Sequence, residues 1–149
     1  MGTATFHMNP DDIPEVRLER PWGTTWMRLI RVSLAENSFT NIVRWKAGTQ
    51  LPTHLHTGSV DAFTMEGAWR YLEYDWSAKA GDYVHEPPGT VHTLRAEEDT
   101  TVFFVNQGGF VWYGPNGEMT KYQDAASTLA DVQQVLAAGG LVLPPGVTD

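Results

Sequence analysis

The chain has 149 residues, a length that fits one domain with enough hydrophobic core to fold without disulfides or a structural metal. Ten Lys and Arg against eighteen Asp and Glu give a formal net charge of −8, which disfavours nucleic acid and anionic membrane surfaces as partners. The absence of cysteine excludes disulfides, thiolate catalysis and metal sites with Cys ligands, so a metal would have to bind His, Asp or Glu.

Residues 1–21 are polar and contain three prolines, so we predict an N-terminal arm followed by a single domain over residues 22–149. Residues 1–12 have neither the basic nor the apolar region of a secretion signal, and no apolar run reaches the length of a membrane span. We therefore expect a cytoplasmic protein without a membrane partner.

Between residues 22 and 113, short runs of β-branched and aromatic residues alternate with Gly, Pro, Asn and Asp, which predicts a series of strands and turns. Residues 39–45 and 69–73 each place bulky side chains on one face, as half-buried antiparallel strands do. Residues 100–105 and 110–113 are denser in apolar side chains and predict strands covered on both faces.

Only one segment has the periodicity of a helix. Ala125, Leu129, Val132 and Leu136 recur at helical spacing, and a pair of glycines follows, which predicts a helix over about residues 124–138. Many short strands and one C-terminal helix in a chain of this length predict an all-β fold, either a small closed barrel or a sandwich.

His54 and His56 flank a single residue, and positions i and i+2 of a strand project from the same face. Imidazole is the commonest protein ligand for divalent transition metals, so two imidazoles on one face form half of a metal site. Taken alone, however, a His-x-His pattern is more often a pair of surface or hydrogen-bonded histidines.

The spacing around these histidines resembles the two sequence motifs of the cupin superfamily. Gly48, His54, His56 and Gly67 match the first motif, although the position of its glutamate holds Val60. This first resemblance covers the histidine pair and the turns on either side of it.

The second cupin motif is matched by Gly81, Pro87, Gly89 and His92, although Ala96 stands at its final asparagine position. The resemblance implies a cupin double-stranded β-helix, a small closed barrel or jelly roll. In such a fold, neighbouring walls bring the histidine of the second motif beside the two of the first.

We therefore predict a metal site formed by His54, His56 and His92. The glutamate of most cupins is a fourth, anionic ligand, which the hydrocarbon side chain of Val60 cannot replace, while Asp61 would face the opposite side of a strand. A divalent ion bound by three neutral imidazoles keeps its charge and several open positions, which favours a chelating anionic substrate.

Within the cupins, residues 54–58, 69–74 and 86–92 most resemble the 2,4'-dihydroxyacetophenone dioxygenase family and, more distantly, the acetylacetone-cleaving dioxygenases. That resemblance implies a non-haem Fe(II) enzyme that uses O₂ to cleave a C–C bond of a hydroxyketone or β-diketone, giving two carboxylic acids. It also implies that Glu86 lies near the metal, where it would accept an imidazole N–H or anchor a metal-bound water. The alternative for Glu86 is a surface carboxylate in a turn.

Two other functions stay open. The site could bind Zn, Mn or Ni and catalyse isomerase or lyase chemistry, or the protein could be a non-catalytic sensor, like the metal-binding parts of certain anti-sigma factors. Paired barrels in the superfamily imply a homodimer or homotetramer. Candidates for lining a pocket that takes a flat aromatic substrate are Trp45, Trp69, Arg70, Glu73, Tyr83, His85 and Trp112.

Overall fold

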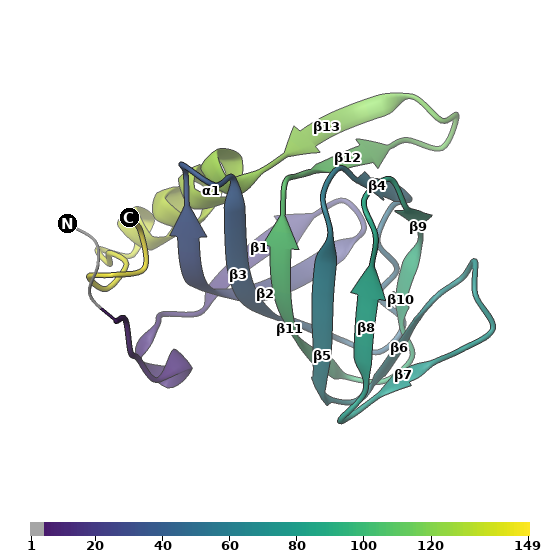
Figure 1. The fold of residues 1–149 in the computed structure, drawn as a ribbon, viewed down its shortest axis with the longest axis horizontal. Helices are drawn as coiled ribbons and strands as arrows, with labels where there is room; N and C mark the ends of the chain where they lie inside the picture. The colour runs from purple at the N-terminus through teal and green to yellow at the C-terminus, as the bar shows by residue number, and fades with distance from the viewer. Residues whose placement is uncertain (1–4) are drawn as a thin grey trace.

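Within residues 5–149, which the computed structural model describes, the chain forms thirteen strands, the short 3-10 helix η1 (Pro10–Asp12) and the α-helix α1 (Ala125–Ala138) (Figure 1). The strands are β1 (Val16–Arg20), β2 (Gly23–Ser33), β3 (Ser38–Trp45), β4 (His54–His56), β5 (Val60–Glu66), β6 (Ala68–Tyr71), β7 (Ala78–Lys79), β8 (Tyr83–Glu86), β9 (Val91–His92), β10 (Leu94–Ala96), β11 (Thr100–Gln107), β12 (Phe110–Tyr113) and β13 (Met119–Gln123). The predicted all-β architecture with one C-terminal helix is confirmed.

The strands form three sheets, in the orders β1-β2-β3-β11-β5-β8, β13-β12-β4-β9 and β10-β6-β7. Over the described residues these sheets do not join into one closed barrel, so the closed-barrel form of the prediction is wrong and the jelly-roll form holds. At residues 108–109 the chain leaves the large sheet after β11 and enters the four-stranded sheet as β12. The two strands are therefore not hairpin partners.

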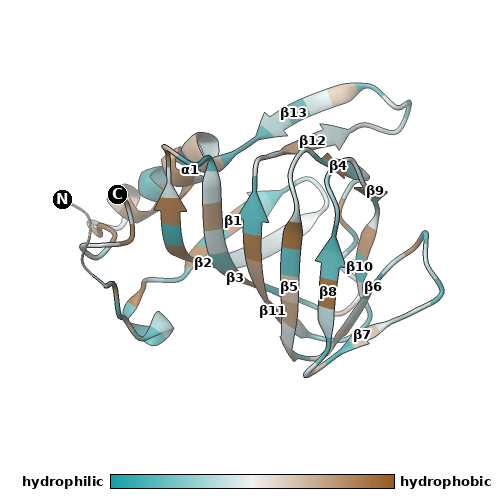
Figure 2. Ribbon diagram, in the orientation of Figure 1, coloured by the Kyte–Doolittle hydropathy of each residue, from teal (hydrophilic) through white to brown (hydrophobic). Residues whose placement is uncertain are grey.

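The large sheet supplies one wall of the interior. β3 pairs antiparallel with both β2 and β11, and it buries Phe39, Val43 and Trp45 on one face, as the sequence predicts. Buried side chains alternate with partly exposed ones along β11, and Figure 2 shows apolar residues in β5, β8 and β11 of this sheet. This alternation gives the sheet one face that packs against the core and one that meets solvent.

Part of the segment predicted as an arm belongs to this sheet. Residues 16–20 form β1, which pairs antiparallel with β2 and buries Val16 and Leu18. The two apolar side chains alternate with charged ones, which is the period-two pattern of a half-buried edge strand.

Helix α1 packs beside β1 and β2 (Figure 1). Its N-cap Asp124 accepts a hydrogen bond from the backbone of Ser127, whose hydroxyl in turn accepts one from the backbone of Asp124, forming a capping box. The buried side chains of the helix are Ala125, Thr128, Leu129, Val132 and Leu136. No helix in the described part of the chain is long and apolar enough to span a membrane.

Candidate metal centre

Three histidines meet on the inner face of the four-stranded sheet. β4 carries His54 and His56, both buried, with Leu55 between them pointing the other way. β9 pairs antiparallel with β4 and places His92 directly opposite His54. The strand period and this register bring together the three histidines that the sequence analysis selects.

A carboxylic acid reaches the same place from the large sheet. Gly81 and Gly89 have positive φ angles of 91° and 86°, and the turns they form lie on either side of β8. Glu86 ends β8 and is 2% exposed, whereas the preceding residue, His85, is exposed. Of these two neighbouring residues, only Glu86 therefore faces the histidines.

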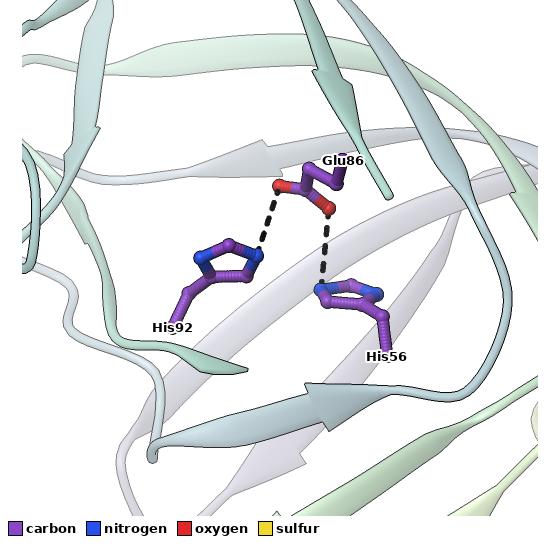
Figure 3. A group of neighbouring side chains, drawn as sticks. All are labelled: His56, Glu86 and His92. Atoms are coloured by element: carbon purple, nitrogen blue, oxygen red, sulfur yellow. Dashed lines mark ion pairs between the residues drawn. The ribbon is translucent and has the colours of Figure 1, made fainter. Parts of the chain in front are cut away.

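Glu86 lies between two of the histidine rings (Figure 3). Its Oε2 is 3.3 Å from Nε2 of His56, and its Oε1 is 3.9 Å from Nε2 of His92. The possible ligand atoms of these three residues all lie within 4.8 Å of one another. Two imidazole nitrogens and a carboxylate oxygen at such distances can face a single small cation.

His54 stands beside this group rather than within it. Its ring centroid is 4.8 Å from that of His56 and 6.3 Å from that of His92. Its Nδ1 is 2.9 Å from the carbonyl oxygen of Pro52, and because a carbonyl only accepts, this nitrogen is the protonated one. Burial lowers the pKa of His54 to about 4, so the ring is neutral and its Nε2 carries a free lone pair.

The polar atoms of this group have no hydrogen-bond partners in the protein. Both ring nitrogens of His56 and His92 and both oxygens of Glu86 are buried and unpaired. Burial lowers the pKa of His56 to about 2 and that of His92 below its usual range, and it raises the pKa of Glu86 to about 8. Neutral imidazoles and a carboxyl with no other partner are the donor set that a divalent cation would satisfy, so these residues fit a bound metal.

The acid group is the main difference from the site that the sequence predicts. Val60 is fully buried, as an inward-facing residue at the glutamate position of the first motif should be. Glu86, however, is the direct cross-strand partner of Val60, so the large sheet places a carboxyl one strand away from the expected position. Glu86 is predicted from the sequence to lie outside the ligand set, and the structure puts its oxygens against His56 and His92.

Aromatic rings surround the histidines, and most of them are not among the pocket residues predicted from the sequence. Tyr71 stacks on His92 with ring centroids 4.0 Å apart and planes 15° apart. Phe110 lies 4.7 Å from His56, and Trp112 lies 4.7 Å from His54, measured between centroids. Tyr71 shares a strand face with buried Trp69, as the sequence predicts for residues 69–73, although Tyr71 is not among the predicted pocket residues.

Several other candidates lie away from the site. Tyr83 is 64% exposed and donates its hydroxyl to Asp61, which also pairs with His85 on the outer surface. Trp69 is a core residue whose indole N–H donates to Thr64 at 2.8 Å. Glu73 accepts hydrogen bonds from the backbone and hydroxyl of Thr93.

A cavity of about 90 Å³ adjoins His54 and His56. Its polar lining includes Asn41 and Asn106, whose side chains lie 3.4 Å apart. The aromatic residues that line it are Trp22, Phe39, Trp45, Tyr71, Phe104, Phe110 and Trp112. The histidines therefore open onto a mostly apolar space that can hold a small organic molecule.

Comparison with solved structures shows the same fold in proteins from bacteria. An RmlC-like cupin protein from Ralstonia eutropha JMP134 superimposes with a TM-score of 0.88 at 23% identity, covering 95% of this chain and 92% of that one. An acetylacetone dioxygenase from Acinetobacter johnsonii superimposes with a TM-score of 0.83 at 19% identity, covering 91% of this chain and 95% of that one. At these identities the likeness concerns the fold.

Sequence comparison finds a similar stretch in a plant protein and a match to a family. The DNA damage-repair/toleration protein DRT102 of Arabidopsis thaliana is 33% identical over 86 residues, which are 55% of this chain and 26% of that protein. The chain thus spans about a quarter of the length of this relative. The family model of the ChrR cupin-like domain matches residues 3–111. The chain therefore belongs to the ChrR cupin-like family of the cupin superfamily.

Proposed function

We propose that this protein is a non-haem Fe(II) dioxygenase that cleaves the C–C bond of an α-hydroxyketone with O₂. The observation that carries the proposal is the buried group of His54, His56, His92 and Glu86 beside an apolar cavity. The fold that the chain shares with an acetylacetone dioxygenase supports the same reaction class.

The residues that would hold the metal are His56 and His92, with His54 adding its Nε2 as a third imidazole. Bound iron would supply a Lewis acid that polarises the substrate oxygens, and it would activate O₂. Imidazole ligands suit iron, zinc and nickel alike, so the identity of the metal as iron is itself proposed. The hydrogen bond from His54 to the carbonyl of Pro52 fixes the tautomer and the ring orientation.

Glu86 is placed to handle the substrate's proton. Its carboxyl is buried against two histidines with both oxygens free of hydrogen bonds in the protein, and a divalent cation beside it would favour the ionised form, which can accept a proton. When an α-hydroxyketone binds, its hydroxyl must lose a proton to become a good chelating anion. We assign Glu86 as the acceptor of that proton.

The surrounding rings orient the substrate and exclude water. Phe110 and Trp112 contact the histidines of β4, while Tyr71 covers one face of His92. An apolar lining strengthens the electrostatic interactions of the few polar groups in it and limits side reactions with water. A planar substrate suits a cavity lined by so many rings.

The proposed reaction balances without any other reactant: R–CO–CH₂OH and O₂ give R–COOH and HCOOH. The bond between the carbonyl and hydroxymethyl carbons breaks, and each of these carbons gains one oxygen atom. The four electrons that reduce O₂ come from the substrate, so no external reductant is required.

The test is O₂ uptake by protein loaded anaerobically with Fe(II), using 2,4'-dihydroxyacetophenone as substrate. We expect one O₂ consumed per ketone, with matching amounts of aryl acid and formate. The matched control is 4'-hydroxyacetophenone, which lacks the second chelating oxygen and should give no uptake. A flat trace for both ketones with iron bound stoichiometrically would overturn the proposal.

A second candidate is a metal-binding protein without catalysis, favoured by the position of Glu86. If His54, His56, His92 and Glu86 all ligate one ion, they complete a four-coordinate sphere, and closed sites are typical of structural metals. Such a protein would keep its metal in the presence of the ketones and consume no O₂. The predicted homodimer or homotetramer is compatible with either function, and light scattering after size exclusion checks it.

A further inference from the structure

Two hollows of this protein share part of their lining. The inner cavity of about 90 Å³ adjoins His54, and an outer groove of about 750 Å³ lies next to it. The groove's exposed residues are Pro21, Gln50, Pro115, Thr120 and Lys121. The side chains that line both hollows are Arg20, Trp22, Leu51, Trp112 and Gln123. These five side chains lie at the border between the groove and the cavity beside the histidines, and we call them the neck.

Two indoles form one part of the neck. Trp22, in the turn between β1 and β2, stacks with Trp112 on β12 at a centroid distance of 6.5 Å and an interplanar angle of 23°. Trp112 pairs across the strands with His54, and their ring centroids are 4.7 Å apart. The neck thus places two aromatic faces beside the first histidine, an arrangement that favours flat rings.

A positive charge forms another part of the neck. The Nη2 of Arg20 and the Nζ of Lys121 each lie 3.2 Å from the same oxygen of Asp131. Two cations share one carboxylate there, so a positive charge is left over in a chain whose net charge is −8. Arg20 lines both hollows and is 30% exposed at its side chain, so its guanidinium can meet a ligand in the neck.

Helix α1 holds these side chains in place. Gln123 accepts a hydrogen bond from the indole N–H of Trp112 at 3.2 Å and donates one to the hydroxyl of Thr128 at 3.0 Å. Thr128 is buried in α1, the same helix that carries Asp131. The ring and the guanidinium are therefore both tied to one rigid element, which reduces the ordering cost when a ligand binds.

We propose that this neck selects an aromatic ligand whose ring carries a carboxylate at the end remote from its ketone. The ring lies against Trp22 and Trp112, the carboxylate pairs with Arg20, and the ketone points inward to His54 and His56. This inference rests on the proposed function for the ketone chemistry. Recognition of the ring and its carboxylate depends only on the protein's own side chains and takes place without metal.

The test is calorimetric titration of metal-free protein with 4-acetylbenzoate and its neutral counterpart 4-acetylbenzamide, neither of which has a second chelating oxygen. We expect the carboxylate to bind about tenfold more tightly, as one charge-assisted hydrogen-bonded pair allows. Arg20→Gln should abolish this preference. Arg17→Gln is the matched control, because Arg17 lies on the same strand, is exposed and pairs with Glu19 on the surface.

Equal affinity of the two probes for the wild-type protein, or a preference that survives in a folded R20Q variant, would overturn the inference. A second variant tests the ring contact. The wild type should bind 4-acetylbenzoate more tightly than 4-acetylcyclohexanecarboxylate, and Trp22→Leu should remove this preference. A preference that persists in the variant would overturn the indole contact. Circular dichroism checks that each variant is folded.

The same titrations separate this inference from the proposed function. If iron-loaded protein consumes no O₂ but the preference for 4-acetylbenzoate and its loss in R20Q are observed, ligand selection by the neck is supported and the dioxygenase activity is refuted. If O₂ is consumed and the two probes bind equally, the dioxygenase activity is supported and ligand selection by the neck is refuted.

Discussion

Val60 and Glu86 are direct cross-strand partners in β5 and β8, and both side chains are buried, at 0% and 2% exposure. Directly opposed residues on one face of an antiparallel pair have Cβ atoms only about 5 Å apart. The carboxyl that the first cupin motif would place at position 60 is therefore supplied from the neighbouring strand. The site keeps an acid group although the motif position holds a hydrocarbon.

This pairing predicts the effect of exchanging the two residues. Glu86→Val should weaken Fe(II) or Zn(II) binding at least tenfold, because the only buried carboxyl beside His56 in the described chain is lost. The double variant V60E/E86V should recover much of that affinity from the adjacent strand. Metal titration with a chromophoric chelator as competitor measures both effects.

V60E alone is the control for this exchange. It places two buried carboxyls opposite each other, so we expect the metal-free protein to lose stability as the second carboxyl ionises. A double variant that binds metal no better than E86V would show that the carboxyl functions only at position 86.

The raised pKa of Glu86 predicts how the metal-free protein responds to pH. Burial raises this pKa from 4.5 to about 8 in the folded protein, so above pH 4.5 the unfolded chain loses the proton that the folded protein retains. The free energy of unfolding of the wild type should fall, relative to E86Q, as pH rises from 4.5 to 8. The difference should reach about 3–5 kcal/mol at pH 8.

Urea unfolding of both proteins in the presence of a chelator, between pH 4.5 and pH 8, measures this difference. The histidines titrate in both proteins, so their contribution cancels in the comparison. Parallel stability curves over that range would show that the pKa of Glu86 is near its ordinary value.

His56→Ala separates metal binding from folding. His56 lies at the centre of the buried group, so its loss should reduce bound iron from one per chain to near zero. The core has its own apolar contacts, so the far-UV circular dichroism should not change. His85→Ala is the matched control, because His85 is exposed beside Glu86, and it should keep full iron; stoichiometric iron in H56A would remove His56 from the ligand set.

Tyr71 fixes the ring of His92 by stacking on it at 4.0 Å. We expect Tyr71→Phe to keep wild-type metal affinity, because the stacked ring remains. Tyr71→Leu should lower the affinity about tenfold, since changes next to a metal ligand commonly cost that much. Competitive metal titration of folded variants checks this, and equal affinity in Y71F and Y71L would exclude a positioning role for the ring.

Periodicity and motif spacing predicted much of the fold. The strand at residues 39–45 and the helix near residues 124–138 follow from side-chain alternation and helical spacing, and both lie where these patterns put them. The partners of each strand could not be predicted, because pairing depends on contacts between residues far apart in the chain. For this reason β11 and β12, adjacent in sequence, belong to different sheets.

The same limit applies to the site. The His-x-His pattern predicts which histidines share a face, but the position of Glu86 depends on the register between β5 and β8. The place of Arg20 in the neck could not be predicted for another reason. Arg20 ends a short edge strand inside a proline-containing segment, and local composition gives no indication that this strand reaches the neck.

The reaction of iron-loaded protein with 2,4'-dihydroxyacetophenone under ¹⁸O₂, followed by mass spectrometry of the products, tests the proposed dioxygenase activity most directly. We expect one ¹⁸O atom in the aryl acid and one in formate, with no product from the H56A variant, as C–C cleavage by a dioxygenase requires. Recovery of unlabelled ketone with stoichiometric iron still bound to the protein would contradict it.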